Sequence, residues 1–107
     1  MNDVQHFEAA RALAERALAE AGGSREERIT WLYRTVLARQ PDADELKIVA
    51  AAHEKQLAMY QADPKSAKAA IHVGESTPKA KSPSAETAAW TLTANLILNL
   101  DETVNRN

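Results

Sequence analysis

Apolar residues recur at helical spacing along most of the chain, and this pattern predicts five helices. The periodic stretches cover about residues 4–21, 25–39, 43–62, 64–73 and 83–104. The fourth stretch is short, and the connections between stretches are brief enough to favour antiparallel neighbours. The sequence therefore predicts one all-α domain over residues 1–107, a compact bundle of four main helices and one short helix.

The first predicted helix has one apolar side and clear signals at both ends. Asn2 or Asp3 is its expected N-cap, because either side chain can accept a hydrogen bond from a free backbone N–H. We expect Gly22-Gly23 to end the helix, with a glycine in the left-handed conformation. The apolar stripe is formed by Val4, Phe7, Ala10, Ala14, Ala17, Leu18 and Ala21.

The second and third predicted helices each begin with a capping box. Ser24 is followed three residues later by Glu27, and Asp42, after Pro41, is followed by Glu45. Each helix has an apolar side that should be buried. On the second helix the buried side consists of Ile29, Leu32, Tyr33, Val36 and Leu37, and on the third of Leu46, Val49, Ala50, His53, Leu57 and Tyr60.

The third helix also has apolar residues on its opposite side. Ile48, Ala52 and Met59 lie there, which would allow this helix to be covered on both sides. After it, Asp63-Pro64 is a cap followed by proline at the first helical position, and Gly74 should end the short fourth helix.

The last predicted helix is apolar around most of its circumference and should therefore be central in the bundle. A helix with this pattern is usually buried among other helices. Trp90 and Ile97 lie on one side. Another side is formed by Ala85, Ala89, Leu92, Leu96, Leu100 and Val104.

Composition and charge exclude several function classes. With 13 Lys and Arg against 15 Asp and Glu, the chain has a formal net charge of −2 and lacks the positive field that dominates nucleic-acid affinity. A helix-turn-helix over the second and third helices is disfavoured, because a recognition helix beginning Asp42-Ala43-Asp44-Glu45 would bring acids to DNA phosphates. No apolar run is long enough to insert into a membrane.

The chain also lacks the usual residues of self-contained catalytic and metal sites. It has no cysteine, so disulfides, Cys-type zinc sites, thiol nucleophiles and covalent haem attachment are excluded within it. Neither a Gly-x-Ser-x-Gly motif nor a phosphate-binding glycine loop occurs. We therefore predict no catalytic, cofactor-binding or metal-binding residues in this chain.

Two of the three histidines and one tryptophan nevertheless have alternative interpretations. His53 lies among apolar residues, which favours a neutral core histidine over a metal or haem ligand. His72, near Gly74-Glu75, is a candidate for a small polar site. Trp31 projects away from the buried side of its helix and is either packed on a neighbouring helix or an interface anchor.

Five pieces of the chain, in this order, resemble the C-terminal region of a family of unknown function in large planctomycete-type proteins. They are Asn-Asp-x-Gln-x-Phe-x-x-Ala-Ala-Arg at Asn2–Arg11, then Leu32–Pro41, Val73–Ser76, Ala89-Trp90 and Asn99–Thr103. The family often has proline at the position of Val4, glycine at that of Ala38 and an aromatic residue near Thr103.

The resemblance implies that the chain is the C-terminal part of a larger, exported protein that commonly carries a cytochrome-c-like domain elsewhere. Haem would then belong to the parent, and the upstream domains of the same polypeptide would be the partners. It implies no catalytic residue in this segment.

Three hypotheses follow. The first is a structural or interaction module that packs on the rest of the parent. The second is a segment that completes an active or ligand site with upstream domains, with Glu75, Asn99, Asp101 and Glu102 as the polar candidates. The third is ligand or haem contact through His53 or His72. The oligomeric state is not predicted.

Overall fold

The computed structural model describes residues 4–72 and 84–104, with side chains from Phe7 to His72 and from Ser84 to Leu100. These residues contain helices and no strand, so the predicted all-α fold is confirmed. The helices are α1 (Val4–Glu20), α2 (Arg25–Leu37), α3 (Ala43–Ala62), α4 (Pro64–Ile71) and α5 (Ser84–Val104). No helix in this part of the chain is long and apolar enough to cross a membrane.

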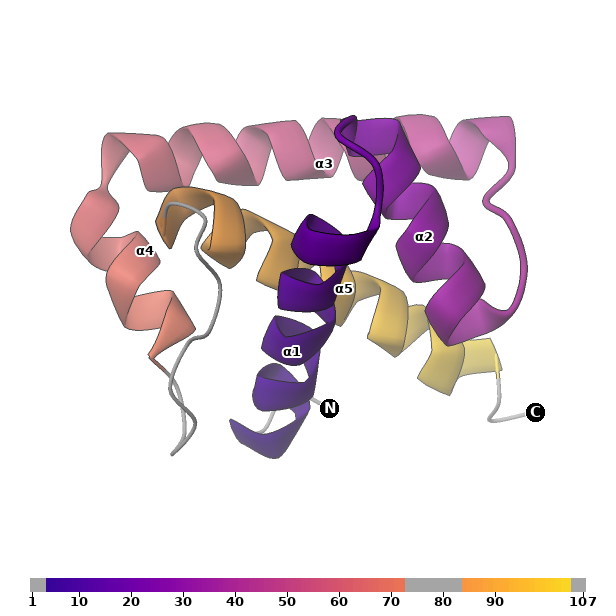
Figure 1. Cartoon of the computed structure of the whole chain (residues 1–107), viewed down its shortest axis with the longest axis horizontal. Coiled ribbons are helices and arrows are strands. Elements are labelled where there is room, and N and C mark those ends of the chain that lie inside the picture. Colours follow the sequence, from indigo (N-terminus) through magenta and orange to yellow (C-terminus); the bar gives the residue numbers. More distant parts are fainter. Residues whose placement is uncertain (1–3, 73–83, 105–107) are drawn as a thin grey trace.

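Helix α5 lies at the centre of the molecule, as its sequence pattern predicted. It contacts each of the other helices. In Figure 1, α3 runs along one edge, α1 crosses α5, and α4 and α2 lie toward opposite ends of α3. The fully buried apolar side chains of α5 are Ala88, Ala89, Trp90, Ala94 and Ile97, each 0% exposed.

Small side chains bring α1 against α5. Ala10, Ala14 and Ala17 are each 0% exposed and share one core cluster with Ala94 and Ile97 of α5. Because alanine has no side chain beyond Cβ, two helices that meet through it can approach closely. This contact explains why the predicted apolar stripe of α1 consists mainly of alanine.

Both predicted capping boxes are present. In α2, the backbone N–H of Glu27 donates to Ser24 Oγ at 3.1 Å, and Ser24 N–H donates to Glu27 Oε1 at 3.2 Å. In α3, Glu45 N–H donates to Asp42 Oδ1 at 2.7 Å, and Asp42 N–H donates to Glu45 Oε1 at 3.0 Å. These reciprocal bonds satisfy N–H groups that the helix itself leaves free.

The end of α1 differs from the sequence prediction. The helix ends at Glu20, and neither Gly22 nor Gly23 has the left-handed conformation that we expected. A Cβ at position 22 would meet the carboxyl group of Glu27, so a larger residue there would require the Glu27 side chain to shift. The same carboxylate forms the capping box of α2, so the turn and the cap are coupled.

The left-handed residue occurs instead after α2. That helix ends at Leu37, two residues earlier than predicted, because Ala38 has φ 58° and ψ 30°. An L-residue other than glycine is strained there by about 1–2 kcal/mol. The resemblance noted above places glycine at this position in other members, and the left-handed backbone supplies a physical reason for it.

Two further expectations need correction. Helix α4 ends at Ile71 rather than near residue 73. The carbonyl oxygen of Ile71, left free at this helix end, accepts a hydrogen bond from Nη1 of the buried Arg11 of α1. The apolar outer side of α3 is not covered by any described helix, since Ile48 is 67% and Met59 56% exposed.

Replacing the strained Ala38 with glycine should stabilise the protein. We expect Ala38→Gly to raise the free energy of unfolding by about 1 kcal/mol, because glycine adopts positive φ without a Cβ clash. Urea denaturation measures the change. Ala12→Gly, at an exposed position inside α1, is the control and should lower stability by about 0.5–1 kcal/mol. Destabilisation by both substitutions would contradict the left-handed assignment.

Candidate functional site: the pocket beside Trp31 and the His53 centre

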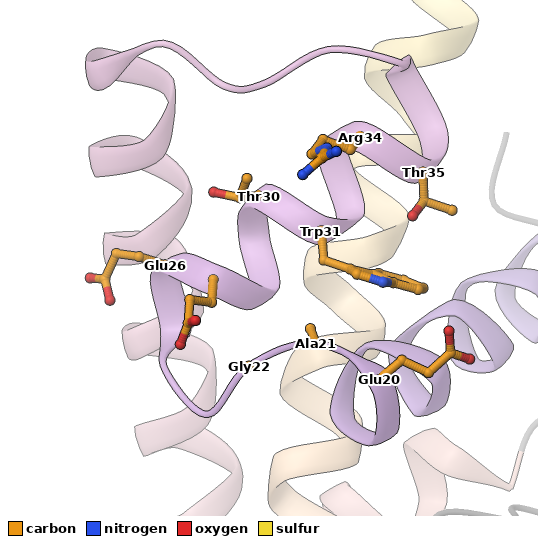
Figure 2. Close-up of a pocket in the computed structure, with 9 residues that line it drawn as sticks. Glu20, Ala21, Gly22, Glu26, Thr30, Trp31, Arg34 and Thr35 are labelled. Atoms are coloured by element: carbon orange, nitrogen blue, oxygen red, sulfur yellow. The ribbon is translucent and has the colours of Figure 1, made fainter.

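A surface pocket with a volume of about 750 Å³ lies where the end of α1 meets α2. Figure 2 shows the indole of Trp31 reaching from α2 toward Glu20 at the end of α1. The turn that follows α1 and the exposed side of α2 form the walls. The lining residues are Glu20, Ala21, Gly22, Glu26, Glu27, Thr30, Trp31, Arg34 and Thr35.

Trp31 is held between the two helices. Its side chain is half-buried and packs against the main core cluster. On α1, the guanidinium carbon of Arg16 lies 5.2 Å from the centre of the indole ring, within cation–π range. Arg16 Nε also donates to Glu20 Oε2 at 3.3 Å. Trp31 therefore packs on a neighbouring helix while also lining a pocket.

The charges around this pocket are unequal. Three carboxylates, from Glu20, Glu26 and Glu27, line it together with the cation of Arg34, and Arg16 beside the pocket pairs with Glu20. Glu26 is exposed and makes no hydrogen bond or ion pair with any described residue, whereas Glu27 is engaged in the capping box. The pocket thus combines an aromatic wall with excess negative charge, which suits a cationic guest.

A second polar centre is buried in the core around His53. This side chain is 2% exposed, and its Nδ1 accepts a hydrogen bond from Arg25 Nε at 2.9 Å. Its ring stacks on Trp90 of α5, with ring centres 3.9 Å apart and planes 31° apart. Because Nδ1 is the acceptor, the proton of the neutral ring is on Nε2, which lies buried without a partner among the described residues.

The surroundings of His53 oppose its protonation. Burial and the positive charges of Arg25 and Arg28 lower its pKa from 6.5 to about 4. At neutral pH the imidazole is therefore uncharged, and its only basic lone pair is occupied by Arg25. This geometry favours a core histidine over a metal or haem ligand.

The remaining predicted site residues are only partly within the described structure. His72 is exposed where α4 ends, and Asn99 is partly buried on α5. Glu75 and the side chains of Asp101 and Glu102 lie outside the described residues, so a site shared by residues 74–76 and 99–102 stays a prediction. Among the residues with described side chains, no three His, Asp or Glu lie close enough to hold a metal ion.

Arginines form contacts that the sequence interpretation did not anticipate. Arg11 is only 4% exposed, and Arg25 is the partner of His53. Arg11 lies between Ala10 and Ala14 on the apolar stripe of α1, and that position was an available signal of burial.

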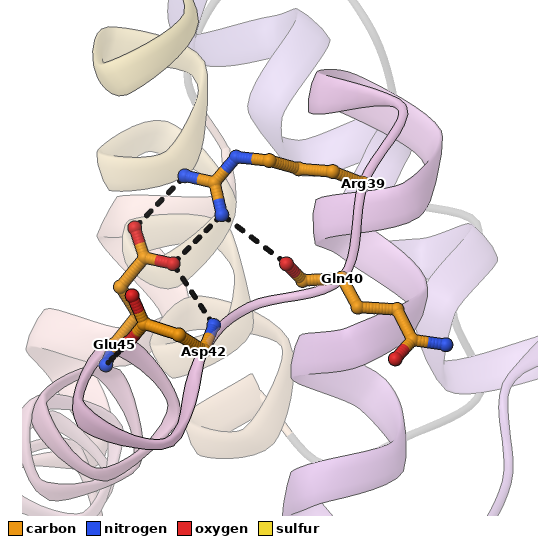
Figure 3. A network of polar contacts seen from close by, with 4 residues as sticks. All are labelled: Arg39, Gln40, Asp42 and Glu45. Carbon is orange, nitrogen blue, oxygen red and sulfur yellow. Dashed lines mark hydrogen bonds and ion pairs between the residues drawn. The ribbon is translucent and has the colours of Figure 1, made fainter.

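Arg39 is the third arginine whose contacts were not anticipated, and it belongs to a polar network at the connection between α2 and α3 (Figure 3). Arg39 Nη1 and Nη2 donate to the two carboxylate oxygens of Glu45 at 2.7 and 2.8 Å. The Arg39 guanidinium carbon also lies 5.3 Å from the ring centre of Tyr33. The bond from Arg39 and the backbone N–H of Asp42 lower the pKa of Glu45 from 4.5 to about 2. This bidentate pair positions the start of α3.

The depressed pKa of His53 predicts a loss of stability in mild acid. The histidine pKa is near 6.5 in the unfolded chain and about 4 in the folded chain, so the unfolded state binds more protons between these values. Lowering the pH from 7 to 5 should therefore reduce the stability of the wild type by about 1–2 kcal/mol more than that of His53→Gln. Urea denaturation at both pH values measures the difference. Equal losses in both proteins would contradict the proposed protonation state.

The Arg39–Glu45 pair predicts a measurable carboxylate titration. Glu45 should titrate near pH 2 in the wild type, and Arg39→Gln should raise its pKa toward the usual range because the bidentate donor is lost. Carbon-detected NMR of the Glu45 carboxyl group follows both titrations. A wild-type Glu45 titrating near 4.5 would refute this geometry.

The comparisons with known proteins identify one relationship. No curated protein and no solved structure matches the chain. A family model described as a protein of unknown function (DUF1553) matches residues 1–53, which include α1, α2 and the first half of α3. The match supports a relationship between this chain and that family, carried by the N-terminal half of the chain.

Proposed function

We propose that this chain is a helical interaction module of a larger member of that family, without catalytic activity of its own. The observation that carries the proposal is the pocket of about 750 Å³ beside Trp31. It lies within the residues that match the family model, at the meeting point of α1 and α2. We propose that a segment of the parent polypeptide bearing a basic side chain docks there.

The chemistry of the pocket supports a basic guest. A Lys or Arg side chain combines an apolar stem, which can pack on the indole of Trp31, with a cationic head that can reach carboxylates. Glu26 is exposed and available for such a contact, and Glu20 can share its carboxylate between Arg16 and the guest. An acidic guest would instead meet the excess negative charge.

We also propose what kind of parent protein carries this chain. The resemblance described above supports an exported parent with a cytochrome-c-like domain. Since the chain has no cysteine to attach haem, any such cofactor would be held by other parts of the parent.

Binding of a basic side chain at the pocket can be tested with small peptides. The capped tripeptide Ala-Arg-Ala should shift the indole N–H resonance of Trp31 in ¹H–¹⁵N NMR, with a dissociation constant on the order of 1 mM for one anchoring side chain. Capped Ala-Glu-Ala should leave the resonance unchanged. The variant Glu20→Gln/Glu26→Gln should weaken binding several-fold, whereas Glu54→Gln, the same kind of change outside the pocket, should not.

Two results would count against the proposal. Equal shifts with the basic and acidic peptides would show that the charge of the pocket does not select its guest. In the longer parent, deletion of this segment should lower stability or activity, and an unchanged parent would contradict the docking role.

A further inference from the structure

Arg16 lies beside the Trp31 pocket and contacts two of the side chains that line it. Its guanidinium carbon lies 5.2 Å from the centre of the Trp31 indole, and its Nε donates to Glu20 Oε2 at 3.3 Å. Trp31 and Glu20 both belong to the pocket wall, whereas Arg16 does not. Arg16 therefore makes, with these two side chains, the contacts that a basic guest in the pocket would need.

These contacts of Arg16 are made at the surface and can be exchanged without unfolding. The side chains of Arg16 and Glu20 are 55% and 53% exposed and lie one turn apart on α1. Exposed ion pairs at this spacing and exposed cation–π contacts are individually weak. Figure 2 shows the carboxylate of Glu20 turned toward the indole of Trp31, so a guest that offers the same groups can reach both.

We infer that Arg16 is an internal competitor of the guest and sets the selectivity of the pocket, an inference that rests on the proposed function. Arg16 occupies Glu20 Oε2, so the guest is left with the other carboxylate oxygen. An arginine guest loses most by this, because its guanidinium pairs with both oxygens of a carboxylate at once, whereas the ammonium of lysine is a point donor. Arg16 thus lowers the affinity for arginine more than the affinity for lysine.

An internal competitor favours a guest that belongs to the same polypeptide. Every guest must give up part of its binding energy to exchange with Arg16, and a free basic peptide then binds weakly. A segment tethered to the pocket by a short flexible linker has an effective concentration on the order of millimolar, and it tolerates this loss. The contact therefore discriminates between a segment of the parent and unrelated basic chains.

Peptide titrations of Arg16→Gln test the competition. Removal of the guanidinium should raise the affinity for capped Ala-Arg-Ala roughly two- to fivefold, the scale of one exposed ion pair with a cation–π contact, and should raise the affinity for capped Ala-Lys-Ala less. The indole N–H resonance of Trp31 follows both titrations. Glutamine and arginine have similar helix propensities, so α1 is preserved. An equal gain for both peptides would overturn the inference, because it would show only the loss of one positive charge.

Arg34→Gln is the matched control for charge. Arg34 lines the pocket but makes no ion pair with any described residue. Its removal takes away the same charge without releasing Glu20, so it should strengthen the binding of both peptides alike. A rise in the preference for arginine as large as in Arg16→Gln would overturn the competition through Glu20.

Two further measurements locate the competition at Glu20. In a Glu20→Gln background, most of the gain from Arg16→Gln should disappear, because the shared carboxylate is gone; a gain of full size would overturn the inference. In the wild type, the Nε–H resonance of Arg16 should move as Ala-Arg-Ala saturates the pocket, since its bond to Glu20 is exchanged. A resonance that stays in place at saturation would overturn it.

The failure of this inference differs from the failure of the proposed function. If neither the wild type nor Arg16→Gln binds a basic peptide, both are overturned. If the wild type binds the basic peptide and not the acidic one, and Arg16→Gln binds with unchanged affinity, only the role of Arg16 is overturned.

Discussion

The close contact between α1 and α5 is the constraint on which the fold depends. Ala10, Ala14 and Ala17 have no exposed surface, and they pack where α5 presents Ala94 and Ile97. Small side chains leave no room for adjustment, because a larger one would overpack the contact at a cost of about 1–3 kcal/mol. Once α1 and α5 are this close, the remaining helices can bury their apolar sides only around the rest of α5.

Two buried hydroxyls of the central helix α5 find partners within the helix, whereas Thr87 Oγ1 and Trp90 Nε1 are buried without a partner among the described residues. Thr91 Oγ1 donates to the carbonyl oxygen of Thr87 at 2.7 Å, and Thr93 Oγ1 donates to that of Ala89 at 3.0 Å. Side-chain hydroxyls that bond to the preceding turn remove the desolvation cost of burying them. The stack of Trp90 on His53 then joins α5 to α3, and the bond from Arg25 extends the connection to α2.

The sequence predicted the features that depend on local patterns. Both capping boxes, the proline start of α4 and the central position of α5 follow from residue spacing, which acts over a few positions. The partner of His53 was not predictable, because Arg25 lies 28 residues away and is brought near only by packing. The left-handed Ala38 escaped prediction because alanine is a strong helix former and gives no signal for that conformation.

The two sides of α3 carry similar apolar residues but differ in burial. Apolar residues on both sides first suggested a helix covered twice, and the described fold covers one side only. The inner side gains its stability from α5, through Val49, His53 and Tyr60. The outer side leaves Ile48 and Met59 exposed beside alanines and charged residues. Because Ile48 is 67% and Met59 56% exposed, these two side chains contribute little hydrophobic burial to the described fold, and the stability of α3 comes from its inner side.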